Sequence, residues 1–311
     1  MSVDPTPHLI VPFAQCSGDE WLQVATELDL KNLGQLLRGM KLIATDNGQT
    51  DSLSPPHERV QATALGLAGS ADGLIPWAAM ETKASPGQGW AVVTPCHWAM
   101  GREHATLTDP ATLDVTEAES RTLLAAMQPY FATEGITLHY SQPTRWLAEG
   151  DVFSTLPTAS LDRVLGRNVD RWLPPSKTIK LLQNEMQMLL YTHPINDERA
   201  AKGQRLVNSF WVSGSGALKD SAVGNPQVKT ATKLMQAAFA NDWSAYAQAW
   251  TQLDAADIAQ LVTQQKSGQI VRLSLCGDSH AMTFESAQHG FLTRIKKTLS
   301  PQRTADLLKL L

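Results

Sequence analysis

Cysteine is scarce in this chain and lacks the spacing of zinc and redox sites. The 311 residues include three cysteines, Cys16, Cys96 and Cys276, which lie far apart and form no CxxC pair. Zinc ribbons and thioredoxin-type sites are built on such pairs. The spacing therefore predicts three buried, reduced thiols.

Long apolar runs are absent as well. No stretch approaches the roughly 20 apolar residues that a membrane-spanning helix needs, so membrane insertion is not expected. The apolar run near the N-terminus, residues 9–14, is short and follows no basic region. A secretory signal requires both features, and we therefore expect a cytoplasmic protein.

Excess positive charge is also missing. The chain has 26 Lys and Arg against 30 Asp and Glu, a formal net charge of -4 at pH 7. Nucleic acids and anionic membranes are bound by clustered Lys and Arg, so neither is an expected partner. Small molecules or proteins are expected instead. With 43% hydrophobic residues the chain can bury a sizeable core.

Apolar runs bounded by Pro, Gly or Asp alternate along the chain with helical patterns, which indicates an α/β fold. The predicted strands are residues 8–14, 90–95, 104–108, 136–140, 208–213 and 270–276. The predicted helices are residues 20–28, 33–40, 57–67, 117–131, 177–191, 227–239 and 243–253. Residues 214–224, rich in Gly and Ser, are expected to form a loop.

Two helix starts carry capping residues. Thr116 and Glu119 are spaced as a capping box, and Ser176 precedes an apolar stripe with helical spacing.

After residue 144 the residue pattern again becomes typical of extended segments. This change suggests a smaller lobe over residues 91–151, with residues 1–90 and 152–311 forming the main core.

The segment from His193 to Gly216 is the stretch of the sequence that is most informative about function. Its predicted strand leads into Ser213-Gly214-Ser215-Gly216. Ligands of open α/β sheets bind beyond the carboxyl ends of strands, where a Gly/Ser turn lets the backbone approach an anion. A plain strand-to-loop turn explains the same residues, since neither a Walker lysine nor a complete dinucleotide motif is present.

The string HPIN, then Arg, Gly and VNSFWVSGSG, resembles the archaeal-type cofactor-independent phosphoglycerate mutases. The segments SLDRVLGRNVDRWLP (160–174) and TEAESRTLLAAM (116–127) are similar to parts of the same family, in the same order. Leu30-Lys31-Asn32-Leu33 resembles the start of an early family helix. A closer likeness still is to bacterial proteins called regulatory RpfE type.

The resemblance implies an alkaline phosphatase-like three-layer sandwich, here shortened, with a small inserted α+β lobe. In that family two divalent metals, such as Mn, Mg or Zn, and a phosphorylated serine act on a phosphorylated small acid. Guanidinium groups suit such a ligand because they bind phosphate through two hydrogen bonds. The ligand-binding candidates are Arg145, Arg163, Arg167, Asn196, Arg199, Asn208, Ser213 and Ser215. For Arg163 and Arg167, ion pairs with nearby Asp162 and Asp170 are an equally good explanation.

The chain departs from the family where metals would bind. The opening strand runs into Val11-Pro12-Phe13-Ala14, without the metal-binding aspartate of the family, and residues 217–269 contain no histidine. Asp278-Ser279-His280 is similar to the final Asp-His-Ser motif, with a serine inserted between aspartate and histidine. Asp278 and His280 are therefore the metal candidates, although an aspartate also commonly caps a turn of this composition.

Two functions follow from these expectations. The first is a degenerate mutase-like protein, non-catalytic, that binds a phosphorylated metabolite or regulates a protein partner. The alternative is an active metal-dependent phosphoglycerate mutase or phosphoesterase.

Overall fold

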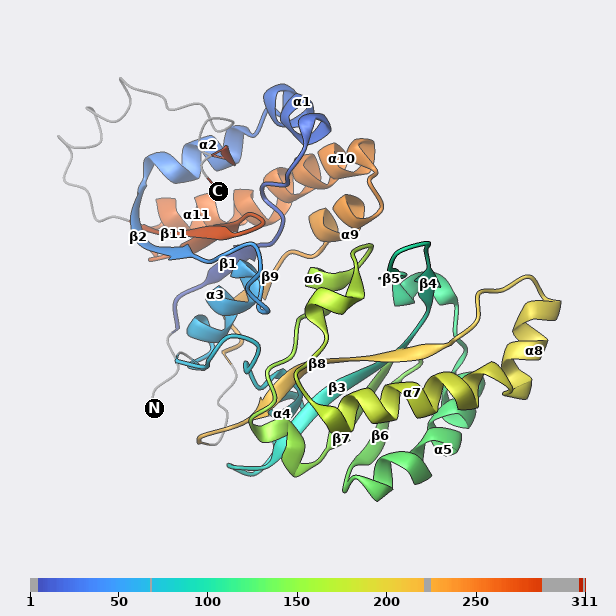
Figure 1. Cartoon of the computed structure of the whole chain (residues 1–311). Coiled ribbons are helices and arrows are strands. Elements are labelled where there is room, and N and C mark those ends of the chain that lie inside the picture. Colours follow the sequence, from blue (N-terminus) through green and yellow to red (C-terminus); the bar gives the residue numbers. More distant parts are fainter. Residues whose placement is uncertain (1–4, 68, 221–224, 287–307, 310) are drawn as a thin grey trace. The chain divides into compact units, whose positions relative to one another are not determined.

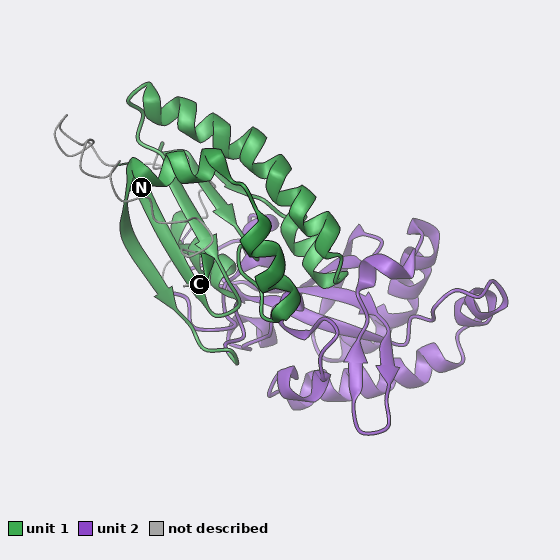
Figure 2. Ribbon diagram, turned by 90° about the horizontal axis from the view of Figure 1, so that it is seen from above, with its two compact units in different colours: residues 1–51, 55–68, 223–311 green, residues 52–54, 69–222 purple. Residues whose placement is uncertain are grey.

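The computed structural model describes residues 5–67, 69–220, 225–286, 308–309 and 311. The chain forms two compact units, shown in green and purple in Figure 2. Unit 1 comprises residues 1–51, 55–68 and 223–311, and unit 2 comprises residues 52–54 and 69–222. Unit 2 contains the expected lobe, residues 91–151, but is wider. A separate inserted lobe with those bounds stays a prediction.

Unit 1 is built on a five-stranded mixed sheet in the order β2-β11-β10-β1-β9. β1 (His8–Val11) runs parallel to β10 (Arg272–Cys276) and to β9 (Val228–Thr230). β11 (His280–Ser286) is antiparallel to both β10 and β2 (Met40–Asn47). The helices of unit 1 are α1 (Asp19–Glu27), α2 (Lys31–Arg38), α3 (Pro56–Ala64), α9 (Lys233–Phe239), α10 (Trp243–Leu253) and α11 (Ala259–Lys266), with a π-helical turn at Asp254–Ile258.

Side chains of β1 point alternately to the two faces of this sheet, and helices cover both faces. Leu9 and Val11 belong to the large core that α1, α2, α10 and α11 cover, which also buries Trp21 and Trp250. Ile10 points to the opposite face and packs with Val60 of α3. Successive side chains of a strand point to opposite faces of its sheet, so a strand that is buried on both faces contacts helices on both sides. Unit 1 therefore confirms the predicted α/β class.

Unit 2 is built on a four-stranded antiparallel sheet in the order β6-β7-β3-β8. Its strands are β3 (Gly89–Cys96), β6 (Thr137–Gln142), β7 (Arg145–Glu149) and β8 (Ser209–Ala217), beside a small hairpin of β4 (Trp98–Met100) and β5 (Ala105–Leu107). Its helices are α4 (Trp77–Glu81), α5 (Glu117–Thr133), α6 (Leu161–Val164), α7 (Lys177–Tyr191) and α8 (Pro194–Ala201), with short 3-10 turns at Pro110–Leu113, Asp151–Ser154 and Val169–Trp172. Figure 1 shows α5 and α7 side by side over the sheet, where they bury a shared core around Trp146 and Phe210.

The two predicted helix starts are confirmed. Thr116 accepts a hydrogen bond from the Glu119 N–H (3.2 Å), and the Glu119 carboxylate accepts one from the Thr116 N–H (2.8 Å). The Ser176 hydroxyl accepts from the Ile179 N–H (3.3 Å) at the start of α7. Each contact satisfies a backbone donor that the first helical turn leaves open.

Two predicted elements are wrong in extent. Residues 227–239 were expected to be one helix, but the first part forms β9 against β1 and α9 begins only at Lys233. β8 continues through Ser213-Gly214-Ser215-Gly216 to Ala217, where a loop was expected, and residues 221–224 lie outside the described residues. None of the described helices has both the length and the apolar character to cross a membrane.

Candidate functional site

The carboxyl ends of β1, β9 and β10 share one edge of the unit 1 sheet, because these strands are parallel. The segments that follow β1 and β10 meet there. The Ala14 N–H donates to the Cys276 carbonyl (2.8 Å), and the Asp278 N–H lies 3.5 Å from the Gln15 side-chain oxygen. Ligands of α/β sheets bind at this kind of edge, which we call the carboxyl edge of unit 1.

The loop after β1 is held in a strained conformation. Phe13 has φ 54°, which is left-handed backbone for a bulky residue. The Tyr246 hydroxyl donates to the Phe13 carbonyl (2.7 Å) and lies 3.3 Å from that of Ala14, while the Trp21 indole N–H donates to the Tyr246 oxygen (3.2 Å). Burial raises the pKa of Tyr246, so its hydroxyl stays protonated as a donor. Strain of this kind concentrates at functional sites.

Cys16, in the same loop, is kept as a thiol. Burial, reinforced by the Asp278 carboxylate, raises the pKa of Cys16 to about 12. Burial also raises the pKa of Cys96 and of Cys276. All three cysteines are buried and free of disulfides, as predicted. Because the thiolate is the nucleophilic form, the protonated Cys16 thiol is a poor nucleophile at neutral pH.

Asp278 and His280 lie on the turn between β10 and β11, at the carboxyl edge. The Asp278 carboxylate accepts a hydrogen bond from the Ser17 hydroxyl. His280 is exposed at the first position of β11, and its Nδ1 lies 2.7 Å from the Ser279 hydroxyl. The Gly277 N–H donates to the His280 carbonyl (2.8 Å) and closes the turn. Metal binding by this pair stays a prediction.

The part of each unit that the structure describes forms no complete metal site by itself. Among the described residues of each unit taken by itself, no three His, Cys, Asp or Glu side chains converge at ligand distance. A bimetallic phosphoryl-transfer centre needs several such ligands held together. The described residues of unit 1 therefore do not fit the two-metal centre that the resemblance implies.

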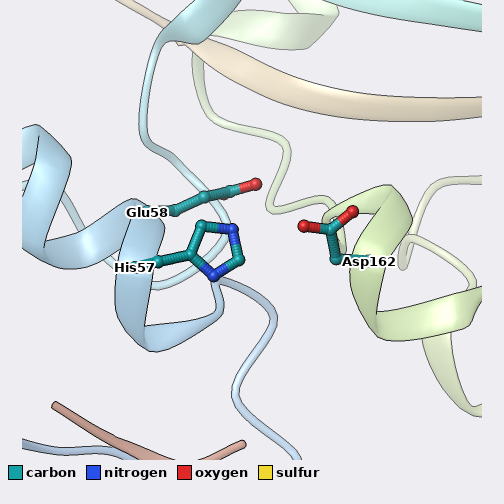
Figure 3. A group of neighbouring side chains, drawn as sticks. All are labelled: His57, Glu58 and Asp162. Atoms are coloured by element: carbon teal, nitrogen blue, oxygen red, sulfur yellow. The ribbon is translucent and has the colours of Figure 1, made fainter. Parts of the chain in front are cut away.

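The start of α3 contributes polar residues that the sequence patterns did not single out as site residues. His57 and Glu58 come from the first helical turn, after Pro55 and Pro56 (Figure 3). Arg59, one position further, pairs with Asp46 at the end of β2 at 2.5 Å and reaches within 3.5 Å of the Ser279 carbonyl. The signal was the proline pair, since proline is favoured at the first position of a helix. Figure 3 also labels Asp162, which lies on α6 of unit 2.

In unit 2, the predicted anion-binding turn is a bulged strand. β8 shifts register against β3 where Trp90 faces Gly216 and Val92 faces Ser213. The Ser215 hydroxyl is buried and lies 2.8 Å from the Thr158 hydroxyl and 2.5 Å from the Leu156 carbonyl. Because β8 is antiparallel to β3, the rule for carboxyl ends of parallel strands does not apply, and the predicted loop is wrong. A ligand contact by Ser213, which is half-buried, stays a prediction.

The two candidate asparagines are engaged by the backbone. Asn196 is buried, donates to the carbonyls of Leu190 (2.7 Å) and Val207 (2.8 Å), and accepts from the Val207 N–H (3.0 Å). Asn208 accepts from the Trp98 N–H (2.7 Å) and donates to the Trp98 carbonyl (3.0 Å). Each asparagine side chain thus links two segments of unit 2 through hydrogen bonds.

Arg199 is fully buried, and three of its nitrogens donate hydrogen bonds. Nε donates to the Arg205 carbonyl (2.8 Å), Nη1 donates to the Glu119 carboxylate (2.9 Å), and Nη2 donates to the Leu113 carbonyl. Partial burial raises the pKa of Glu119, but hydrogen bonds from Thr116 and Arg199 outweigh this and lower it overall. Arg199 and Glu119 therefore form a structural ion pair.

The remaining candidate arginines differ in exposure. Arg163 is buried on α6, and Arg145 pairs with Glu81 of α4 at 2.5 Å. Arg167 is exposed on the turn that follows α6. Of Arg163, Arg167 and Arg199, Arg167 is the exposed residue and the other two are buried.

Neither a family model nor a curated protein matches this chain. Two solved structures are similar over almost the whole chain. A cofactor-independent phosphoglycerate mutase from Thermoplasma acidophilum DSM 1728 is 13% identical, with a TM-score of 0.36, over 92% of this chain and 90% of that one. The PH0037 protein from Pyrococcus horikoshii is 10% identical, with a TM-score of 0.47, over 98% and 96%. The resemblance is distant, and neither likeness bears on function.

Proposed function

We propose that this chain is a phosphoglycerate mutase-like protein without mutase chemistry, which binds a phosphorylated metabolite and serves a regulatory role. Its shortened fold is proposed to derive from the alkaline phosphatase-like sandwich. The observation that carries the proposal is in unit 2. Asn196, Arg199, Asn208 and Ser215, in the segment that resembles the mutases, have their polar groups engaged by the protein itself.

The carboxyl edge of unit 1 supports the same conclusion. The opening strand runs into Val11-Pro12-Phe13-Ala14, without the carboxylate that binds metal in the family, and the nearby Cys16 is protonated. Metal-assisted phosphoryl transfer requires ions that activate a nucleophile and neutralise charge on the phosphoryl group. With Asp278 already hydrogen-bonded to Ser17, the edge supplies few of the anionic ligands that such ions need.

For the ligand contact we assign Arg167. It lies in the SLDRVLGRNVDRWLP segment and is exposed, whereas Arg163 and Arg199 are buried. An exposed guanidinium can form two parallel charge-assisted hydrogen bonds with a phosphate. Arg167 can therefore bind a phosphate without any change to the buried contacts of the fold.

Calorimetric titration with 3-phosphoglycerate and with inorganic phosphate tests this assignment. We expect binding of the phosphorylated acid, weakened roughly tenfold or more by Arg167→Ala, since a hydrogen bond to a charged group contributes about 1.5–3 kcal/mol. Arg171→Ala, an exposed arginine four positions further along, is the matched control and should bind as the wild type does. No binding of either probe, or an equal loss in both variants, would refute the assignment.

The alternative function is a metal-dependent mutase or phosphoesterase. It is favoured by one observation, the presence of Asp278 and His280 together on the turn at the carboxyl edge. Carboxylate and imidazole are ligands of divalent ions. Elemental analysis of the purified chain distinguishes the two functions, because the alternative requires about two bound metal ions per chain and the main proposal requires none.

A further inference from the structure

The outer face of α7 carries large apolar side chains in contact with water. The side chains of Leu181, Met188 and Tyr191 are 49%, 77% and 87% exposed. The inner face of the same helix is fully used, since Ile179, Leu182, Met186 and Leu190 are buried in the core of unit 2. The helix therefore has a second apolar side that this core does not explain.

The exposed residues follow a defined spacing. Leu181, Asn184, Met188 and Tyr191 are separated by three, four and three residues. This is the a and d spacing of a heptad, the pattern by which two helices pack along a seam. On the same assignment the buried residues Ile179, Leu182, Met186 and Leu190 fall at f, b, f and c, away from the seam. One helix thus presents two separate faces, one to its own core and one to solvent.

We infer that the seam of α7 packs against α7 of a second copy of this chain, in parallel. Lys180 and Glu185 flank the seam at the g and e positions, and both reach solvent. In a parallel pair, a g residue faces the e residue five positions further along in the partner helix. Lys180 of each copy would then face Glu185 of the other, giving two complementary ion pairs.

The antiparallel alternative lacks this complementarity, because it sets g against g and e against e, lysine against lysine and glutamate against glutamate. Asn184 occupies a d position, so the seam has one polar position among three apolar ones. The seam spans one fifteen-residue helix, so it falls in the class of small, reversible interfaces below about 1,200 Å². We therefore expect a dimer with a Kd on the order of 10–100 μM.

Sedimentation velocity of the full chain over a range of concentrations, with charge-reversed variants, tests this inference. Lys180→Glu alone places glutamate against Glu185, and Glu185→Lys alone places lysine against Lys180, so each variant should dimerise at least tenfold more weakly. The double variant restores opposite charges and should dimerise as the wild type does. An equimolar mixture of the two single variants should form mixed dimers, since both ion pairs are then complementary.

Two controls separate dimerisation from folding. Glu198→Lys and Lys202→Glu reverse two exposed charges on and beside α8, outside α7, and they should leave the association unchanged. Thermal unfolding of each monomer checks that the variants fold. A wild type that stays monomeric to about 200 μM, twice the upper end of the expected Kd range, or single variants that associate as the wild type does, would overturn the inference. Failure of the double variant and of the mixture to recover would contradict the parallel pairing.

Discussion

Arg199 illustrates how one residue type serves two purposes at the residue scale. A guanidinium that could hold a phosphate can equally hold carbonyls and a carboxylate, because both present oxygen acceptors. In this chain the Arg199 side chain is 0% exposed and its donors reach Arg205, Leu113 and Glu119. A buried charge is tolerated only with such partners. One of the arginines predicted to contact a ligand therefore joins the start of α5 to α8.

Replacing Glu119 tests the importance of this pair. We expect Glu119→Gln to lower the free energy of unfolding by about 3 kcal/mol at pH 7, since it leaves the buried Arg199 charge without its carboxylate. The folded-state pKa of Glu119 lies below its ordinary value of 4.5. Its contribution is therefore complete above that value and is lost as the pH falls through the folded-state pKa. The difference between variant and wild type should shrink below pH 4.5.

Urea unfolding between pH 7 and pH 3 measures this difference. Glu117→Gln, on the same helical turn, is the matched control. Its exposed pair with Arg121 should contribute less than about 1 kcal/mol. A Glu119→Gln effect as small as that of Glu117→Gln, or one that stays constant down to pH 3, would contradict the role assigned to the pair.

At the scale of elements, the bulge in β8 depends on its glycines. Gly216 has φ 146°, and a Cβ there would lie 3.0 Å from the Leu74 carbonyl oxygen and 3.0 Å from the Pro76 Cβ. We expect Gly216→Ala to lower the free energy of unfolding by about 3 kcal/mol, from strained backbone together with close contacts. Gly203→Ala is the control, with φ 68° and nothing within 4 Å of the added carbon. It should cost about 1–2 kcal/mol.

Chemical denaturation with guanidinium measures the free energy of unfolding of both glycine variants under the same conditions. Both positions have positive φ, but they differ in its value and in what surrounds them, so the contrast measures the combined cost of the φ 146° backbone and of the packing of β8 against the segment before α4. Equal losses for the two variants would show that the close approach at Gly216 does not constrain the strand.

The helices with clear internal signals could be predicted from the sequence. α7 and α10 begin and end where their apolar spacing and caps indicated, and α5 starts at its capping box. β2 was missed because nearly all of its residues are exposed, so it has no period-two pattern of burial. β9 was taken for helix because its pairing with β1 is a contact made only in the folded chain. Asp254 caps α2 by accepting from the Leu33 N–H (2.7 Å), across a separation that local patterns cannot reveal.

At the scale of the whole molecule, the sequence predicted the positions of strands and helices better than it predicted which residues form the site. Alternating strands and helices predicted an α/β class, which unit 1 shows, but did not indicate that the sheet of unit 2 is antiparallel throughout. The carboxyl edge of unit 1 brings together residues from β2, α3 and the turns after β1 and β10. His57, Arg59 and Asp46 were not predicted as site residues because their proximity to that edge arises from folding, with no shared motif.

The central claim, that the chain does not transform the phosphorylated metabolite that it is proposed to bind, is tested most directly by ³¹P NMR. The full chain would be incubated with 3-phosphoglycerate and Mn²⁺, Mg²⁺, Co²⁺ or Zn²⁺, and quenched with EDTA before the spectrum is taken. We predict an unchanged spectrum, with neither 2-phosphoglycerate nor inorganic phosphate formed. Multiple turnovers that require added metal and are abolished by Asp278→Ala would contradict the claim.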